Sequence, residues 1–451
     1  MAEYDYDLFV VGAGSGGVRA ARVASELGAR VAIAEMDRLG GTCVNVGCIP
    51  KKLFVYGSHF SYDLEDARGY GWSTESSFDW ATLRANKDRE IERLNGIYQA
   101  LLEGAGVDLL KGRARLVDAH AVEMDGTRRT AERILIATGG TAVAPDIPGS
   151  EHALTSNAAF TLDELPRRML VVGAGYIALE LGSVLCALGV NVTLVHRGDE
   201  ILRGFDRDLA CHLHDELEAK GMHILLETRV EELRKTDTAF EARLSNGEVI
   251  ATDLPMFAIG REPNVEGLGL EDVGVELGRH RGIVVDDDFT SSVPSIHAVG
   301  DVTDHIQLTP VAIAEGMHFA HHFYGEDDHR IDYMTIPTAV FCQPELATVG
   351  LTEAEAWHRC QDVRVYKSVF TPLKLALSDR NEHTIVKLVV DASNDRVVGC
   401  HMAGHGAAEI IQGLAIAMKA GATKAHFDAT IGIHPTSAAV FLGFPGLEQL
   451  S

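Results

Sequence analysis

The sequence predicts an α/β protein with two Rossmann-like domains and a C-terminal α+β domain. Two segments each read as a strand, a glycine-rich turn and a helix, the setting in which such a turn binds a dinucleotide. They cover residues 7–27 and 169–188. After Tyr333 the pattern changes to further strands and helices, without another turn of this kind. At about one domain per 150 residues, a chain of 451 residues has room for three domains.

The two Rossmann-like domains are expected to be interleaved along the chain. Residues 134–140 form an apolar strand with a small-residue turn, and Pro145 and Pro148 follow where the chain would enter the second domain. Residues 296–301 resemble a return to the first domain. For the last domain we expect a two-fold interface, a common arrangement in oligomers. The expected boundaries are 1–143 and 273–335 for the first domain, 144–272 for the second and 336–451 for the interface domain.

The composition argues against several classes of partner and location. The net charge of −25 disfavours nucleic acid or an anionic membrane, although a local basic pocket can still bind an anionic substrate. The N-terminal segment shows no signal-peptide pattern, and no apolar run reaches the length of a membrane span. Seven cysteines, an odd and sparse set, do not suggest a secreted disulfide framework, so a reducing, cytoplasmic location is expected. The sequence predicts no metal site.

The first glycine turn has the residues expected for the adenosine half of FAD. It reads Gly12-Ala-Gly14-Ser15-Gly-Gly17, between an apolar strand and an alanine-rich helix. The N-terminus of such a helix presents backbone N–H groups and a positive dipole end to a pyrophosphate. Glu35 ends the next strand at the spacing expected for a partner of the ribose hydroxyls. The alternative is an ordinary glycine turn with a surface glutamate.

The second glycine turn predicts NADPH. Its expected contacts are Gly173, Gly175 and Ile177. The matching strand ends in His196 and Arg197, where a carboxylate would bind a ribose, and Arg203 follows. A carboxylate would repel the 2′-phosphate of NADPH, whereas the two arginines can bind it through charge-assisted hydrogen bonds. The alternative is that both arginines are solvated surface charges.

A third motif contains two closely spaced cysteines. Residues 40–52 read Gly-Gly-Thr-Cys43-Val-Asn-Val-Gly-Cys48-Ile-Pro-Lys-Lys. Zinc sites usually have shorter spacing and a second ligand pair, and the flanking Gly, Pro and Lys residues disfavour two unrelated core cysteines. The run resembles the redox-disulfide signature of the class I pyridine nucleotide–disulfide oxidoreductases. The likeness extends over nearly the whole chain, through residues 308–312 and 413–424 to His434-Pro-Thr.

The resemblance implies a flavoenzyme in which Cys43 and Cys48 form a redox-active disulfide. In this family NADPH reduces FAD, and two electrons then pass to the disulfide. Cys48 would lie against the flavin, and Cys43 would attack the substrate as a thiolate. His434 would be the base that activates the thiol, contributed by the other subunit of a homodimer.

Further site residues follow from the same resemblance. Lys51 and Glu180 would pair beside the flavin N5 atom, and Tyr176 would cover the nicotinamide site until NADPH displaces it. Asp301 would contact the ribityl and phosphate part of FAD. The remaining implied contacts are Gly41, Thr42, Thr138, Gly139 and Thr309 for FAD, and Gly260 for NADPH.

The residues expected to bind the substrate favour an anionic disulfide. Arg19 and Arg22 lie three residues apart on the helix after the first turn, and hence on one face. In the family that face lines the substrate pocket, and Tyr98 matches a tyrosine that lies across it. Basic residues there suit glutathione disulfide, which is negatively charged, whereas the cationic trypanothione calls for acidic or apolar residues. A solvated helix face is the alternative.

Two positions depart from the family pattern. Met317 takes the place of a substrate-binding arginine, and Ala439 that of the glutamate that orients the catalytic histidine. Without the glutamate, slower disulfide turnover is expected unless another acid, such as Glu448, substitutes. Two alternatives stay open: a reductase of another low-molecular-weight disulfide, such as a modified glutathione, and a flavoprotein of this fold with impaired catalysis, which the missing glutamate favours.

Other branches of the family fit less well. His196 and Arg197 disfavour the NAD specificity of lipoamide dehydrogenase. Mercuric reductase and the large thioredoxin reductases have a C-terminal cysteine pair, which this sequence lacks.

Overall fold

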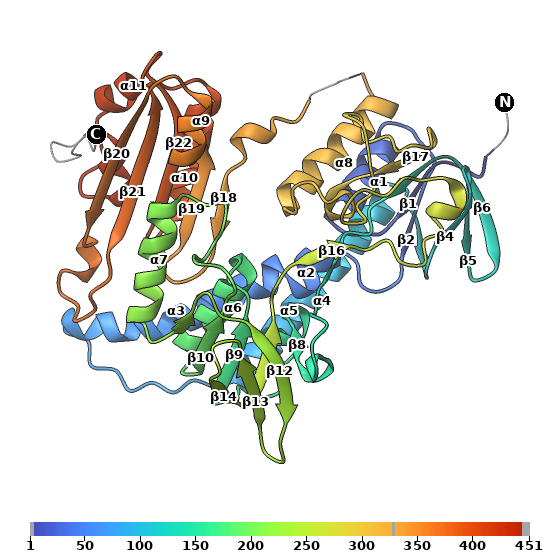
Figure 1. Ribbon diagram of the computed structural model, residues 1–451. Coiled ribbons are helices and arrows are strands. Elements are labelled where there is room, and N and C mark those ends of the chain that lie inside the picture. The colour runs from blue at the N-terminus through green and yellow to red at the C-terminus, as the bar shows by residue number, and fades with distance from the viewer. Residues whose placement is uncertain (1–3, 327–329, 444–451) are drawn as a thin grey trace. The chain divides into compact units, whose positions relative to one another are not determined.

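The computed structural model describes residues 4–326 and 330–443. Contacts between residues divide the chain of Figure 1 into two compact units. The first unit consists of Met1–Lys51, Thr82–Val143 and Gly260–Ile331. The second unit consists of Lys52–Ala81, Ala144–Ile259 and Asp332–Ser451. Each unit has its own sheets and its own hydrophobic core.

The first unit is built on a seven-stranded sheet of order β3-β2-β1-β6-β5-β4, with β17 also paired to β6. The strands of the Rossmann-like part, β1, β2, β3, β6 and β17, run parallel, while β4 and β5 are antiparallel additions. The strands of this sheet are β1 (Tyr6–Val11), β2 (Val31–Glu35), β3 (Asp108–Lys111), β4 (Arg115–Asp118), β5 (Ala121–Met124), β6 (Thr127–Ile136) and β17 (Ile296–Ala298). A separate antiparallel pair is formed by β7 (Gly140–Ala142) and β16 (Arg261–Pro263). Because parallel strands end at one edge of the sheet, the turns after β1 and β2 lie close together there.

Several helices of the first unit begin or end near the residues predicted to form the site. They are α1 (Ser15–Glu26), α2 (Gly41–Val46), the start of α3 (Cys48–Gly69), most of α4 (Trp80–Gly104) and α8 (Thr309–Tyr324), with a 3₁₀ turn η3 (Gly300–Thr303). The helices α1 and α8 pack against each other. Their buried faces share one core with β1 and β2, so the sheet holds the N-termini of both helices in place.

The second unit contains a second parallel sheet, of order β11-β10-β9-β15-β8. A three-stranded antiparallel sheet, β12-β13-β14, accompanies it. The elements are β8 (Leu154–Thr155), α5 (Ser156–Ala159), β9 (Arg168–Val172), α6 (Tyr176–Ala187), β10 (Asn191–Val195), α7 (Arg207–Ala219), β11 (His223–Leu225), β12 (Val230–Lys235), β13 (Phe240–Leu244), β14 (Val249–Thr252) and β15 (Leu254–Phe257).

The C-terminal part of the second unit is an antiparallel sheet of order β18-β19-β22-β21-β20. The helix α10 packs on β19 and β22, and α9 on β20 and β21 (Figure 1). The elements are β18 (Thr338–Val340), β19 (Leu346–Gly350), α9 (Glu353–Arg359), β20 (Val363–Phe370), β21 (Thr384–Asp391), β22 (Arg396–Ala403), α10 (Ala407–Lys419), α11 (Lys424–Ala429) and the 3₁₀ turn η6 (Ser437–Phe441).

The predicted fold class is confirmed. Both glycine turns lie between a parallel strand and a helix, at β1–α1 and at β9–α6. The C-terminal segment forms an α+β layer, and its described residues, up to Gly443, contain no third turn of this kind. The exact domain boundaries stay a prediction. Within residues 4–326 and 330–443, no helix is both long and apolar enough to cross a membrane.

Candidate active site

The turn between β1 and α1 is shaped to admit a phosphate group. Gly14 precedes the first residue of α1, and no side chain caps this end of the helix. The first-turn N–H groups are therefore available to an anion. At Gly17 a Cβ atom would lie 2.0 Å from the carbonyl oxygen of Gly12, so only glycine permits this turn. The turn fits the pyrophosphate of FAD, as predicted from the sequence.

Glu35 lies beside this turn at the end of β2. One carboxylate oxygen, Oε2, accepts a hydrogen bond of 2.8 Å from the N–H of Ala13, and Oε1 accepts one of 2.8 Å from the N–H of Asp37. A carboxylate can accept about four hydrogen bonds, so acceptor sites remain for ribose hydroxyls. The backbone thus fixes the orientation of the carboxylate beside the turn, and its contact with a ribose stays a prediction.

Asp301 lies in η3, at the N-terminal side of α8. Burial raises the pKa of its carboxyl group, and the charge of Arg261 opposes that increase. Hydroxyl donors, such as those of a ribityl chain, would compensate for the lost solvation of such a carboxylate. The buried Glu315 fixes the turn, because its Oε2 accepts a hydrogen bond of 2.7 Å from the N–H of Gly300. Sequence reasoning missed Glu315, because an acid on a helix face gives no signal of its partner.

Other predicted FAD residues lie on turns of the same unit or at the start of α2. The hydroxyl of Thr138 donates to the carbonyl oxygen of Asn264 at 2.8 Å. The hydroxyl of Thr42 accepts from the guanidinium of Arg261 at 3.3 Å. Gly41 and Gly139 have φ of +59° and +69°. These contacts hold the turns together, and the FAD contacts themselves stay a prediction.

The turn between β9 and α6 has the same form as the first one. Gly175 precedes α6, whose N-terminus also has no side-chain cap. A Cβ atom at Gly175 would meet no atom within 4 Å, whereas one at Gly173 would lie 2.2 Å from the carbonyl oxygen of Ala258. The turn is thus tight on its strand side and open where a pyrophosphate would approach. Ile177 follows in the first turn of α6.

A basic group follows β10 in the second unit, where the sequence predicts the 2′-phosphate of NADPH. Arg197 and Arg203 are both exposed. Burial lowers the pKa of the neighbouring His196, and the charges of the two arginines lower it further. The arginines are therefore close enough to act on one imidazole, and a phosphate dianion would relieve the repulsion between these cationic groups.

The two cysteines of the third motif come together through a tight turn. Cys43 lies in the short helix α2, and Cys48 begins α3. Gly47 joins the two helices, and a Cβ atom there would lie 2.8 Å from the carbonyl oxygen of Thr42 and 3.3 Å from the Cα atom of Cys43. The glycine thus lets the chain fold back on itself, which brings the two thiols within hydrogen-bonding reach of each other.

The two thiols differ in burial and in what surrounds them. The pKa of Cys43 is raised, first by the hydrogen bond with Cys48, then by burial and by the charge that a Cys48 thiolate would carry. Cys48 is exposed, and its sulfur lies 3.4 Å from the hydroxyl of Thr309, the first residue of α8. Cys48 itself begins α3, and a helix N-terminus favours a thiolate. Cys43 therefore needs a base before it can act as a nucleophile.

Two asparagines that sequence reasoning missed hold the cysteine motif in place. The amide group of Asn45 donates to the carbonyl oxygens of Leu39 and Gly41 at 3.0 and 2.9 Å. The amide group of Asn95, on α4, donates to Leu39 and to the side-chain oxygen of Asn45 at 2.8 and 3.0 Å. These bonds connect α4 to α2 and so fix the position of Cys43.

Two of the predicted substrate residues, Arg19 and Tyr98, lie near Cys43. Burial raises the pKa of Tyr98, the charge of Cys43 raises it further, and the charge of Arg19 lowers it. These three side chains therefore share one electrostatic environment. Arg22 forms an ion pair of 3.3 Å with Glu26 on the same helix. Met317 packs against the core that also contacts Tyr98, so it fills space with apolar atoms where an arginine was expected.

The other predicted active-site residues lie in the second unit or at its border. The buried Glu180 accepts a hydrogen bond of 2.8 Å from the N–H of Phe341 through Oε1. Tyr176 begins α6 and is 38% exposed, and its role of covering the nicotinamide site stays a prediction. Lys51 is the last residue of the first unit, and its pairing with Glu180 stays a prediction.

His434 lies in an exposed loop after α11. Its neighbours Ile431 and Ile433 are 94% and 77% exposed, which is unusual for isoleucine. Ala439, in η6, is buried and offers the imidazole no acceptor. Glu448, which could substitute for the expected glutamate, lies outside the described residues.

Two family profiles match this chain. The profile described as pyridine nucleotide-disulphide oxidoreductase matches residues 6–316. The profile described as pyridine nucleotide-disulphide oxidoreductase, dimerisation domain, matches residues 336–442. The chain belongs to the pyridine nucleotide–disulphide oxidoreductase family. This confirms the resemblance on which the residue roles were based, and it places the C-terminal sheet in the family's dimerisation domain.

Curated relatives of this oxidoreductase match it over nearly its whole length. The chain is 49% identical over 443 residues to the glutathione reductase of Burkholderia cepacia, covering 98% of this chain and 99% of the relative. It is 45% identical over 454 residues to that of Nostoc sp., covering 97% and 99%. It is 43% identical over 453 residues to the chloroplastic/mitochondrial enzyme of Pisum sativum, covering 98% and 82%.

The cofactors of the oxidoreductase are FAD and NADPH. The residues present fit both groups. Each glycine turn leaves the N-terminus of its helix uncapped, Glu35 is oriented toward the first turn, and two exposed arginines follow β10. The assignment of individual residues to individual cofactor atoms stays a prediction.

Proposed function

We propose that this oxidoreductase reduces glutathione disulfide to two molecules of glutathione at the expense of NADPH. The observation that carries the proposal is the grouping of Cys43, Cys48, Tyr98 and Arg19 in one unit, in a chain 43–49% identical to glutathione reductases. A cationic side chain beside the nucleophile suits a negatively charged disulfide. FAD and NADPH, when bound, supply the two electrons that return Cys43 and Cys48 to the dithiol state.

The protein side of the reaction is a pair of thiol–disulfide exchanges. His434 removes the proton of Cys43, whose raised pKa keeps it protonated otherwise. The Cys43 thiolate attacks one sulfur of glutathione disulfide, which breaks the S–S bond, forms a mixed disulfide and releases a thiolate that His434 protonates. The Cys48 thiolate then attacks the sulfur of Cys43. This step releases the second glutathione and forms the Cys43–Cys48 disulfide again.

The proposal includes a homodimer in which His434 serves the neighbouring subunit's cysteines. Three exposed isoleucines, Ile416, Ile431 and Ile433, lie in the dimerisation domain, and exposed apolar side chains of this kind favour a protein partner. His434 lies beside two of them, so a partner that covers them would also receive the histidine. The expected cytoplasmic location stays a prediction.

A second candidate is the reduction of a modified glutathione disulfide that carries less negative charge. Met317 favours it, because an apolar side chain replaces an expected arginine and reduces the positive charge available to the substrate. NADPH oxidation should be followed with glutathione disulfide, amidated glutathione disulfide, trypanothione disulfide and lipoamide in parallel. The first proposal requires the highest kcat/KM for glutathione disulfide, and a clear preference for any other compound overturns it.

The arginines after β10 should determine the choice of nicotinamide cofactor. Each charge-assisted hydrogen bond contributes about 1.5–3 kcal/mol, so Arg197→Ala is expected to raise the KM for NADPH about 10- to 100-fold. The KM for NADH should not change, because NADH has no 2′-phosphate. Steady-state kinetics with both cofactors measures this. Arg359→Ala, at an exposed arginine of α9, is the control. Equal loss with NADPH and NADH would contradict the assignment.

A further inference from the structure

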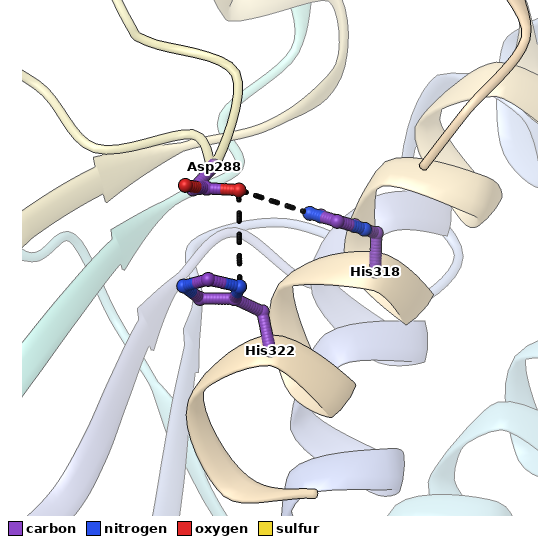
Figure 2. Close-up of side chains that lie close together, drawn as sticks. All are labelled: Asp288, His318 and His322. Carbon is purple, nitrogen blue, oxygen red and sulfur yellow. Dashed lines mark ion pairs between the residues drawn. The ribbon is translucent and has the colours of Figure 1, made fainter. Parts of the chain in front are cut away.

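Three side chains that the disulfide chemistry does not use meet in the first unit. His318 and His322 lie four residues apart on α8, and Asp288 approaches both from the loop before β17 (Figure 2). Asp288 Oδ1 lies 3.5 Å from His318 Nε2 and 3.7 Å from His322 Nδ1. One ligand atom from each residue lies within 4.8 Å of the others. Two histidines at this spacing on one helix face are a recurrent zinc-binding pair.

The spacing of these atoms suits a shared ion better than direct hydrogen bonds. Hydrogen bonds between nitrogen and oxygen measure about 2.7–3.2 Å, and both separations from Asp288 exceed that range. Around a tetrahedral zinc ion with bonds of about 2.0–2.2 Å, neighbouring ligand atoms lie about 3.4 Å apart. The buried Oδ1 atom of Asp288 accepts no hydrogen bond from the described part of the chain. An ion between the three side chains would satisfy this oxygen.

Two of the three side chains, those of His318 and Asp288, are held in position by the surrounding structure. The His318 side chain is only 3% exposed, and its ring lies edge-on against Phe289 with centroids 5.6 Å apart. Asp286 Oδ1 accepts hydrogen bonds from the N–H groups of Asp288 and Thr290 at 3.0 and 2.8 Å. The Asp286 side chain thus fixes the conformation of the loop, and Asp288 points toward α8 (Figure 2). Little rearrangement is needed to bind an ion.

The electrostatic setting also favours a cation. His322 lies in the last turn of α8, where the helix dipole is negative. Asp286 and Asp287 add two carboxylates to the loop that carries Asp288, and Arg330 pairs with that of Asp287 at 3.4 Å, which leaves the Asp286 charge to act on the cluster. Two imidazoles and one carboxylate suit Zn²⁺ and similar transition metals, whereas Mg²⁺ and Ca²⁺ prefer sites made only of oxygen atoms.

We propose that Asp288, His318 and His322 bind one Zn²⁺ ion, with water as the fourth ligand. The ion connects the loop at residues 286–289 to α8. At about 1.5 Å per residue, His318 lies about 14 Å along the helix from Thr309, the residue next to Cys48. The role of the ion is therefore to stabilise the first unit and not to take part in the disulfide exchange. The sequence did not predict this site, because the acid and the histidines come from separate elements.

The test is a zinc titration of the FAD-loaded full chain, with any affinity tag removed and EDTA used to strip metal beforehand. Four proteins are compared: the unchanged chain, Asp288→Asn, His322→Gln and the control His321→Gln. The substituted ligands are 32% and 30% exposed, so all variants are expected to fold. Zinc should raise the melting temperature of the unchanged chain and of His321→Gln. Each of these two proteins should also bind one additional zinc ion per chain with high affinity, compared with Asp288→Asn and His322→Gln.

Loss of a residue that hydrogen-bonds a metal ligand weakens metal binding roughly 10- to 100-fold. Loss of a residue that binds the ion directly should therefore lower the zinc affinity at least about tenfold. His321 lies on the same helix but outside the cluster, so its substitution controls for a general effect on α8. Zinc bound elsewhere, for example by thiols, would be common to all four proteins. Equal zinc affinity and equal thermal shift in all four would overturn the proposal. So would a zinc-soaked crystal without an anomalous peak between the three side chains.

Discussion

Replacing Cys43 with serine is expected to lower NADPH-dependent disulfide reduction by a factor on the order of 10⁴ or more, as for other covalent nucleophiles. Serine has nearly the shape of cysteine, but its hydroxyl cannot form a disulfide. The turn at Gly47 and the bonds from Asn45 do not depend on the sulfur atom, so FAD content and melting temperature should stay unchanged. The measurement is NADPH oxidation with glutathione disulfide.

The two cysteines can be distinguished by what each variant traps. With Cys48→Ser, the Cys43 thiolate can still attack the substrate, but no second thiol resolves the mixed disulfide. One glutathione per chain should therefore remain on Cys43, as mass spectrometry of peptides will show. With Cys43→Ser this adduct should be absent. An adduct on Cys48 in the Cys43→Ser variant would reverse the assigned roles.

Controls for this experiment come from the same chain. Cys211→Ser, at an exposed cysteine of α7, should leave turnover unchanged, because it removes a thiol outside the motif. NADPH-dependent reduction of ferricyanide should persist in both active-site variants, because this acceptor does not need the dithiol. Loss of ferricyanide reduction would mean that the substitutions disturb cofactor binding and not the disulfide chemistry.

The parts of the site that were predictable from the sequence are those encoded locally. A strand, a glycine turn and a helix occupy about 20 consecutive residues, so their order in the sequence is also their order in space. The turns at Gly12 and Gly173 were found in this way. The contact of Cys43 with Cys48 also has a local cause, because only Gly47 fits between the short helix α2 and the start of α3.

The parts that were missed depend on contacts between distant segments. Asn95 supports Asn45 across 50 positions of sequence. The hydrogen bond from Gly300 to Glu315 gave no advance signal, since a helical glutamate has many possible partners. The same reason hid the grouping of Asp288 with the two histidines. Residue type alone does not indicate which of several polar side chains will meet.

Removal of His434 should have a large effect that is specific to the disulfide step. General acid–base groups contribute about 10²–10⁴-fold. We expect His434→Ala to fall at the lower end, about 10²-fold, because Ala439 offers the imidazole no carboxylate to orient it. The measurement is kcat with glutathione disulfide. Ferricyanide reduction should not change, and His358→Ala, at an exposed histidine of α9, is the control.

The pH dependence of the His434→Ala variant tests why the base is needed. The pKa of Cys43 is raised, so at neutral pH its thiolate fraction is small and grows about tenfold per pH unit below that pKa. Without His434, disulfide reduction should therefore rise steeply between about pH 7 and pH 9, while the unchanged chain shows a shallower profile. A flat profile in the variant would mean that Cys43 is already ionised. A loss of kcat near 10⁴-fold in His434→Ala would instead mean that another acid takes the place of the expected glutamate. In that case Glu448→Gln alone, in a chain that keeps His434, should also lower kcat.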